Sequence, residues 1–313
     1  MENMYKYPIK VVSQMTGLSA FVIRAWEKRY NVVIPSRTDT NRRLYSEDDI
    51  EKLKLLNDAV QKGHNIGGIA KLSIAELKSV LERKSERSNM LKESSAEIYS
   101  DINSIISNSI EAIKAYDART FETILLKASS KMSQPVLIEN LIIPLVYKVG
   151  DMWHDGTIRV ANEHLASAVI RSFLTNLIEQ HIPAENAPII ISATPRGQDH
   201  ELGALIAGVV AAAVGWKVIY LGPNLPVEEI AAVSENLEAK VVALSIVYPN
   251  DDPQLKKDFI NLNKMLPSNV LLIVGGRAAK GYLDVLDEMG AVVVKNTKQL
   301  RVELESIREH KYS

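Results

Sequence analysis

Short apolar runs alternate with helical segments throughout residues 187–313. The runs read as β-strands, and each is followed by a stretch with apolar residues at helical spacing. Strands that alternate with helices form a parallel sheet covered on both faces, a doubly wound α/β fold of the flavodoxin-like (Rossmann-like) class. The predicted strands are Ile189–Ala193, Val218–Leu221, Val241–Ser245, Val270–Val274 and Val292–Val294.

Residues 96–183 carry helical periodicity without strand runs. Asp117 is placed to cap the second of four helical stretches, and Pro135 lies in the first turn of the third. Amphipathic helices joined by short connections predict a four-helix bundle. The predicted helices are Ile98–Ala115, Ala118–Met132, Pro135–Val149 and Val160–Gln180.

The N-terminal 81 residues predict a winged helix-turn-helix. A short helix over 7–17 ends at Gly17, and Ser19 caps a second helix, Ala20–Tyr30, after a brief turn. A polar hairpin follows over residues 33–45, and Ser46 caps a helix that runs to Gln61. Residues 82–95 are rich in Ser, Lys, Glu and Arg, and we interpret them as a linker or a frayed helix end. The chain is thus multidomain, with domains at 1–81, 96–183 and 187–313.

Composition removes several classes of function. The chain has no cysteine, so disulfides and thiolate metal sites are excluded. It has no apolar run long enough for a membrane span and no signal-peptide pattern, so we expect a cytoplasmic protein without a membrane partner. The net charge of -1 hides an asymmetry, because residues 1–87 carry 16 Lys/Arg against 11 Asp/Glu. A basic N-terminus on an acidic body predicts a polyanionic partner.

Candidate chemistry lies where the predicted strands end. His200 follows the first strand, Ser245 ends the third, and Gly275 and Gly276 end the fourth. Ligands of open α/β sheets bind at the carboxyl ends of the strands, and glycines let a large group lie against bare backbone. A histidine ligand normally gives its second ring nitrogen to a carboxylate or carbonyl, and the nearby Gln198 offers only an amide oxygen.

The stretch Gln198-Asp199-His200-Glu201-Leu202-Gly203, with Ser245-Ile246-Val247 and Gly275-Gly276 downstream, resembles the cobalamin-binding module of methionine synthase and the mutases. The resemblance implies that the His200 imidazole is the lower axial ligand of cobalt. It also implies that the nucleotide tail of the cofactor lies beside Gly203, Ser245, Val247, Gly275 and Gly276.

Six basic and two acidic residues lie between Arg24 and Arg43, a cluster suited to phosphate contacts. The segments Ile23–Tyr30, Pro35–Arg37 and Asn41–Ser46 resemble the winged helix of MerR-family regulators, with Asn31 where family members usually have glycine. The resemblance implies duplex DNA as a partner. It assigns DNA contacts to Arg24, Lys28, Arg29, Arg37, Arg42, Arg43 and Tyr45.

Trp153 and Glu163 are separated by nine residues, and His164 follows Glu163. This spacing resembles the helical cap of cobalamin-dependent MerR photoreceptors of the CarH/LitR type. The resemblance places Trp153, Glu163 and His164 against the adenosyl group on the upper face of the corrin. It makes His154 an upper cobalt ligand after photolysis.

We therefore expect a light-responsive transcription repressor that binds adenosylcobalamin and is not an enzyme. Expected partners are double-stranded operator DNA, further copies of the chain as a dimer or tetramer, and RNA polymerase. Two alternatives stay open: a regulator of this architecture that responds to a protein partner without cobalamin, and a corrinoid carrier of a methyltransferase or mutase.

Overall fold

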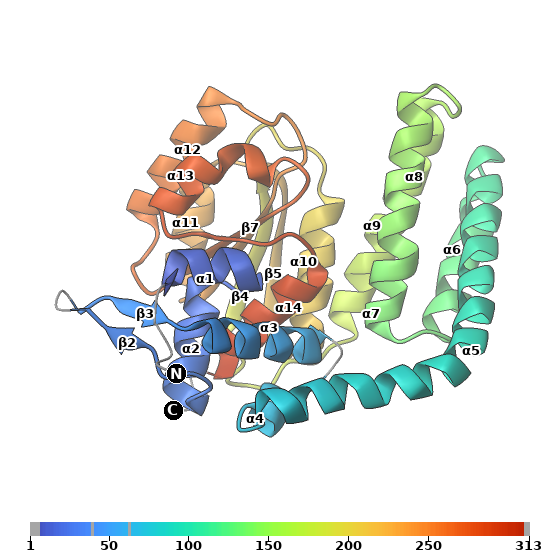
Figure 1. Cartoon of the computed structure of the whole chain (residues 1–313). Helices are drawn as coiled ribbons and strands as arrows, with labels where there is room; N and C mark the ends of the chain where they lie inside the picture. Colours follow the sequence, from blue (N-terminus) through green and yellow to red (C-terminus); the bar gives the residue numbers. More distant parts are fainter. Residues whose placement is uncertain (1–6, 39–40, 62–63, 310–313) are drawn as a thin grey trace. The chain divides into compact units, whose positions relative to one another are not determined.

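The computed structural model describes residues 7–38, 41–61 and 64–309, with backbone alone for 82–100 and Glu309 (Figure 1). It divides into two compact units. One unit contains residues 1–95 together with 301–313, and the other contains residues 96–300.

The N-terminal unit begins with strand β1 (Tyr7–Pro8) and helices α1 (Ile9–Thr16) and α2 (Ala20–Tyr30). The prediction that helix begins at Tyr7 is wrong by two residues, because Tyr7 and Pro8 pair with another strand. The predicted helix ends are confirmed. Gly17 is left-handed with φ 74°, and the Ser19 hydroxyl accepts a hydrogen bond from the Val22 amide.

The wing is a small antiparallel sheet of order β1-β3-β2. Its other strands are β2 (Ser36–Arg37) and β3 (Arg43–Tyr45). Helix α3 (Glu47–Gln61) follows, with Ser46 and Asp49 capping each other reciprocally as in a capping box. The short helix α4 (Ile66–Ile69) completes the domain.

Residues 82–95, interpreted as a linker or frayed helix end, lie in the continuous helix α5 (Ile74–Lys114). The interpretation as a linker is therefore wrong for the backbone. Lys, Glu and Arg are good helix formers, so a segment poor in apolar residues can continue a helix that neighbouring turns have started. The end of α5 supplies the first helix of the bundle.

The rest of the bundle consists of α6, the α7–η1–α8 helix and α9. Asp117 caps α6 by accepting a hydrogen bond from the Thr120 amide, as predicted. The third predicted helix contains an unpredicted π-helical stretch, η1, and it extends five residues beyond Val149. The bounds are α6 Ala118–Ser129, α7 Gln134–Val136, η1 Leu137–Ile142, α8 Ile143–His154 and α9 Val160–Glu179.

The α/β part contains a parallel sheet of order β5-β4-β6-β7-β8. This is the doubly wound order, and the predicted fold class is confirmed. The strands are β4 Ile189–Pro195, β5 Lys217–Leu225, β6 Val241–Ser245, β7 Leu271–Gly275 and β8 Val292–Val293. The helical segments are α10 Leu202–Ala213, α11 Val227–Asn236, α12 Pro253–Met265, η2 Ala279–Tyr282, α13 Leu283–Glu288 and α14 Thr297–Glu309.

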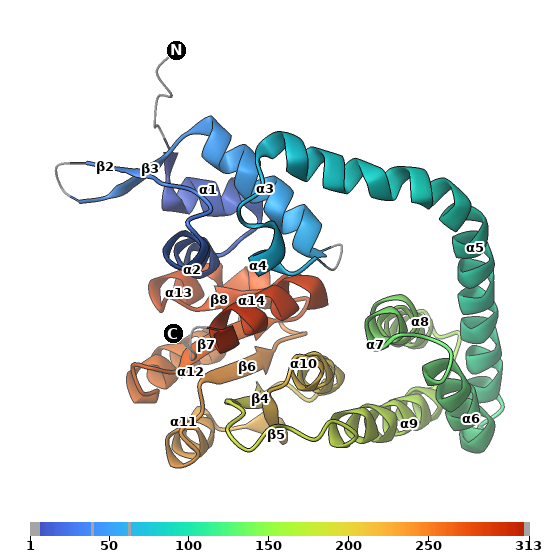
Figure 2. The ribbon, with the colours of Figure 1, turned by 90° about the horizontal axis from the view of Figure 1, so that it is seen from below.

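Helices cover both faces of the sheet, with α11 and α12 on one side and α10 on the other (Figure 2). On its outer side, α10 shares a core with the bundle, in which Leu205 and Val209 pack with Ile170 and Leu174 of α9. Burial of these side chains stabilises the contact by about 1.5–3 kcal/mol each. The helical bundle is thus fixed to the α/β domain through α9 and α10.

Within the described residues, no helix is both long enough and apolar enough to cross a membrane.

Candidate functional site

The sheet order places the candidate residues at the topological switch point. Strands β4 and β6 are neighbours in the sheet, and their connections leave in opposite directions along it. His200 lies in the turn after β4 and is exposed, while Ser245 is the last residue of β6 and is buried. Open parallel sheets bind ligands at this point.

Two glycines are required by close approaches between these strand ends. A Cβ at Gly203 would lie 2.3 Å from the Ser245 hydroxyl oxygen. Gly276 has φ +103°, and a Cβ there would lie 2.1 Å from the Ile246 carbonyl oxygen. A side chain at either position would displace its neighbour or strain the backbone. Gly203 therefore lets the start of α10 approach the end of β6, and Gly276 lets the end of β7 approach the residue after β6.

Gln198 does not serve as the partner we considered for His200. Its amide oxygen accepts hydrogen bonds from the Val247 amide at 2.9 Å and the Tyr248 amide at 3.3 Å, and its amide nitrogen donates to the Tyr248 carbonyl. The side chain is 2% exposed. Gln198 therefore fastens the turn that carries His200 to the loop after β6, and Val247 enters the site through its backbone.

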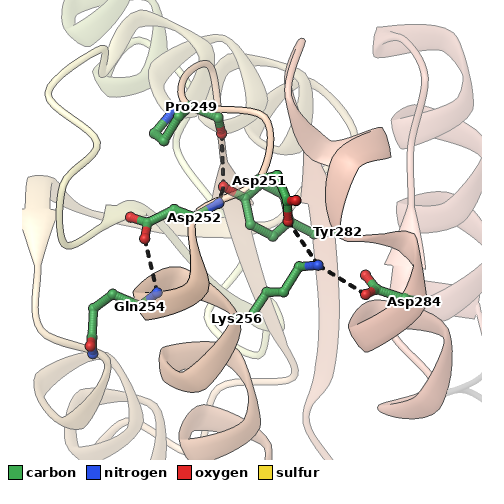
Figure 3. A network of polar contacts seen from close by, with 7 residues as sticks. All are labelled: Pro249, Asp251, Asp252, Gln254, Lys256, Tyr282 and Asp284. Carbon is green, nitrogen blue, oxygen red and sulfur yellow. Dashed lines mark hydrogen bonds and ion pairs between the residues drawn. The ribbon is translucent and has the colours of Figure 1, made fainter.

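The loop between β6 and α12 is held from its other side by a second polar network (Figure 3). The buried Tyr282 hydroxyl donates to the Pro249 carbonyl at 2.8 Å and accepts from the Asp252 amide at 2.9 Å. Lys256 bridges Asp251 at 2.8 Å and Asp284 at 3.0 Å. These carboxylates raise the pKa of Lys256 and keep it cationic. With both sides fixed, the loop presents a preformed edge to the site.

A third cluster, which the sequence reasoning missed, joins the bundle to the His200 turn. Glu201 forms an ion pair with Arg171 of α9 and accepts a hydrogen bond from the Tyr220 hydroxyl of β5. Glu201 is 8% exposed, and the pKa of Tyr220 is raised by burial and then by Glu201. The only signal in the sequence is Arg171 itself, the one charged residue between His164 and Glu179 of α9.

The predicted residues of the helical cap lie at one end of the bundle. Trp153 and His154 end α8, and Glu163 and His164 lie in the first turn of α9. The Glu163 carboxylate accepts from the Ser167 hydroxyl at 2.6 Å and contacts the His164 ring at 2.8 Å. Trp153 is 45% exposed, a large apolar surface left in solvent at the predicted site.

This end of the bundle and the strand ends open toward the same side of the unit. Figure 1 shows the α8–α9 loop and the loops after β4 and β6 at the same end. One contact bridges them, because the Arg277 guanidinium lies 4.9 Å from the ring centroid of Tyr147 of α8. Arg277 directly follows Gly276, so α8 lies beside the glycine pair.

The chain's residues fit a corrinoid in three respects. An exposed imidazole at His200 is accessible to a metal, and histidine is a common ligand of transition metals. Gly203 and Gly276 let Ser245 and Ile246 pack against bare backbone, which brings the residues at the strand ends close together. Trp153 and Tyr147 of α8 are exposed, and the Tyr147 ring contacts Arg277, the residue after Gly276. The structure thus groups the predicted residues of the bundle and of the α/β domain into one candidate site.

The N-terminal unit presents a separate candidate interface for nucleic acid. Arg24, Lys28 and Arg29 are exposed along α2, while Ile23 and Trp26 are buried, as the helical spacing predicted. On the wing, Arg37 and Arg42 are exposed, with Arg37 donating to Asn41 at 2.6 Å. Exposed cations on a helix and an adjacent hairpin suit contacts with a phosphate backbone.

Two residues predicted to contact DNA bond to Glu27 within this domain. Tyr45 is fully buried, and its hydroxyl donates to Glu27 at 3.3 Å. Burial and the Glu27 charge raise its pKa. The Arg43 guanidinium donates to both Glu27 carboxylate oxygens at 2.9 Å. Both side chains therefore attach the wing to α2, which fixes the spacing between the helix and the hairpin.

Family models match all three parts of the chain. Residues 7–75 match the MerR HTH family of regulatory proteins, and residues 107–178 and 188–302 each match a B12 binding domain. The second and third matches cover the bundle and the α/β domain that together form the candidate site.

Relatives match nearly the whole chain. The HTH-type transcriptional repressor CarH of Myxococcus xanthus is 27% identical over 92% of this chain and 94% of its own length. The repressor CarA of the same organism is 26% identical over 93% and 94%. The fold is similar to that of the monomethylamine corrinoid protein of Methanosarcina barkeri, with a TM-score of 0.52 at 15% identity, over 66% of this chain and 99% of that one.

These relatives are named as transcription repressors, which supports the expectation of a regulator rather than an enzyme. The chain is a transcription regulator that combines a MerR-type helix-turn-helix with two B12-binding domains, similar over nearly its whole length to CarH and CarA.

Proposed function

We propose that this chain is a light-responsive repressor that holds adenosylcobalamin between the helical bundle and the α/β domain and releases operator DNA on illumination. The observation that carries the proposal is the grouping at one end of the second unit. His200 lies in the turn after β4, Gly203 at the start of α10 and Gly276 just after β7, and Trp153 lies exposed at the end of α8.

The α/β domain and the helical bundle would each bind one part of the cofactor. His200 would hold cobalt through a ring nitrogen, and the backbone around Gly203 and Gly276 would border the nucleotide tail. Trp153 and the Glu163–His164 pair pack against the upper ligand. Adenosylcobalamin supplies a cobalt–carbon bond that light breaks. The polar links at Gln198 and Glu201 hold the lower half in position before binding, which reduces the ordering cost.

Loss of the adenosyl group would remove contacts that only the helical bundle makes. A ligand shifts a conformational equilibrium only by its differential affinity for the two states, and photolysis changes that difference. Without the adenosyl group Trp153 would be exposed to solvent, and the exposed His154 beside it would be available to hold cobalt. We propose that the dark form is the larger assembly of this chain and the form that binds DNA, with RNA polymerase as a competing partner at the promoter.

The test is size-exclusion chromatography with absorption detection, on protein loaded with adenosylcobalamin, in darkness and after green light. We expect a smaller assembly and a changed spectrum after illumination. Trp153→Ala should weaken dark assembly, whereas Leu126→Ala, which removes a similarly exposed apolar side chain from α6, should not. His154→Ala should leave dark assembly intact and change only the spectrum of the illuminated protein. Equal elution volumes in dark and light would contradict light-controlled assembly.

A regulator that does not use cobalamin is the second candidate, and Gln198 favours it. The usual carboxylate is absent, and both ends of the amide are engaged by the Val247–Tyr248 backbone. His200 therefore receives no charge support from this position. Protein that stays colourless after incubation with cobalamin in darkness would favour this candidate.

A further inference from the structure

The N-terminal end of the DNA-reading helix is already occupied by part of this chain. Residues 301–309 of α14 belong to the same compact unit as the helix-turn-helix. Val302 is part of the apolar core formed by Val22, Trp26 and their neighbours. Beside it, a Glu303 carboxylate oxygen accepts a hydrogen bond from the Ser19 hydroxyl at 2.9 Å. Ser19 is the residue that caps α2.

The N-terminal end of a helix is a favourable position for an anion. The N-terminus of a helix carries unpaired amides and a partial positive charge, so it attracts anions such as phosphate. A recognition helix also reads base edges mainly with its N-terminal residues. Glu303 places an anion at the end of α2 that must approach the DNA.

The contact between Glu303 and Ser19 leaves one hydrogen-bonding group without a partner, which makes α14 easier to detach from α2. Glu303 is 1% exposed, and its second carboxylate oxygen is buried without a hydrogen-bond partner. Burial raises the pKa of this carboxyl to about 7, against the lowering effect of Ser19. A buried carboxylate with one unsatisfied oxygen costs free energy that an apolar side chain would not. Glu303 therefore weakens the docking of α14 that burial of Val302 favours.

We propose that α14 is an autoinhibitory element, whose Glu303 and Val302 occupy the N-terminal end of α2 and compete with DNA for it. The inference rests on DNA binding by α2 as proposed above. Arg24 and Lys28 remain exposed in the docked state, so phosphate contact is possible while insertion of the helix end is blocked.

The first turn of α14 is attached to the helical bundle. The Thr297 hydroxyl donates to Glu139 at 3.2 Å, and the Lys298 ammonium lies 3.7 Å from the same carboxylate. Glu139 belongs to the π-helix η1, in the helix that ends at Trp153 and His154. A movement of that helix would therefore pull on α14 directly, which gives the cofactor site a route to the inhibitory contact.

The test uses the full chain without cobalamin and a fluorescein-labelled mixed-sequence DNA duplex, with binding followed by anisotropy. Glu303→Lys reverses the charge beside the α2 N-terminus and should undock α14. Glu288→Lys makes the same charge change at an exposed position of α13 and is the matched control. We expect Glu303→Lys to bind DNA at least about fivefold more tightly than Glu288→Lys. Hydrogen exchange at the Val22 amide should become faster in Glu303→Lys only.

Glu303→Gln should strengthen the docking of α14, whereas Glu303→Lys should weaken it. Glu303→Gln keeps an acceptor for Ser19 and removes the buried charge, so α14 should dock more firmly and DNA binding should weaken by about fivefold. Equal DNA affinities of Glu303→Lys and Glu288→Lys, in folded proteins, would overturn the proposal. If Glu303→Lys unfolds the domain, Glu303→Gln becomes the deciding variant. A DNA affinity of Glu303→Gln equal to that of wild type would then overturn the proposal. If wild type and every variant fail to bind duplex DNA, while Val22 exchange still responds to Glu303, the DNA-binding function fails and α14 is only a structural contact.

Discussion

Gly276→Ala should destabilise the α/β domain by more than an ordinary glycine substitution. The added Cβ would lie 2.1 Å from the Ile246 carbonyl oxygen and 2.8 Å from the Ile246 nitrogen, both backbone atoms that cannot rotate away. Such overpacking costs about 1–3 kcal/mol. The backbone at φ +103° adds strain of about 1–3 kcal/mol for a residue with a side chain. Together these terms predict a loss of about 2–6 kcal/mol.

Gly290→Ala separates the cost of backbone strain from the cost of overpacking. Gly290 has φ +69° and nothing within 4 Å of an added Cβ, so only backbone strain of about 1–2 kcal/mol applies. The assay is urea unfolding followed by the fluorescence of Trp216, which is 2% exposed in the α/β domain. A Trp26→Phe, Trp153→Phe background removes the other tryptophans of this chain. Equal losses for the two alanine variants would refute the argument that the Gly276 backbone is held against Ile246.

Arg42→Ala should weaken DNA binding and reduce its salt dependence by about one phosphate contact, without changing the thermal midpoint of the N-terminal domain. Arg43→Ala should instead lower the stability of that domain by about 1–2 kcal/mol, because it leaves the Glu27 carboxylate without its ion-pair partner. Thermal denaturation and DNA-binding anisotropy should be measured on both arginine variants. Equal changes of stability and of DNA affinity in the two would contradict the separate roles of Arg42 and Arg43. The pKa of Glu303 is raised from 4.5 to about 7, so its docked form is favoured at low pH and loses stability as pH rises through 7. The thermal midpoint of the N-terminal unit should therefore fall between about pH 5 and about pH 8 in wild type, and this part of the fall should be absent in Glu303→Gln.

Local signals in the sequence predicted most of the elements. Gly17, Ser19 and Asp117 mark helix ends through backbone conformation and capping, which depend on a few adjacent residues. The strand runs and their order of appearance predicted the doubly wound sheet. The grouping of His200 with Ser245 followed because parallel strands place their carboxyl ends at one edge of the sheet.

Contacts between distant segments could not be predicted in the same way. The Gln198 amide bonds to backbone groups 49 and 50 residues away, so its use depends on the path of a loop and not on any pattern around Gln198. The MerR resemblance assigned Tyr45 to the DNA contacts, but its hydroxyl instead donates to Glu27 of α2, a residue 18 positions away. Residues 82–95 continue α5 because their helix propensity is high, although they lack an apolar face. The docking of α14 at Ser19 spans 284 residues and has no local signature.

The most direct test of the account is whether cobalamin binding depends on His200. Wild type, His200→Ala and His181→Ala should be titrated with adenosylcobalamin in darkness and followed by absorption and equilibrium dialysis. His181 is an exposed histidine at the end of α9 that contacts Gln134, so its substitution controls for loss of an imidazole away from the site. We predict that wild type and His181→Ala bind equally. His200→Ala should bind at least about tenfold more weakly, with a changed spectrum. Wild-type affinity and an unchanged spectrum in His200→Ala would contradict the account.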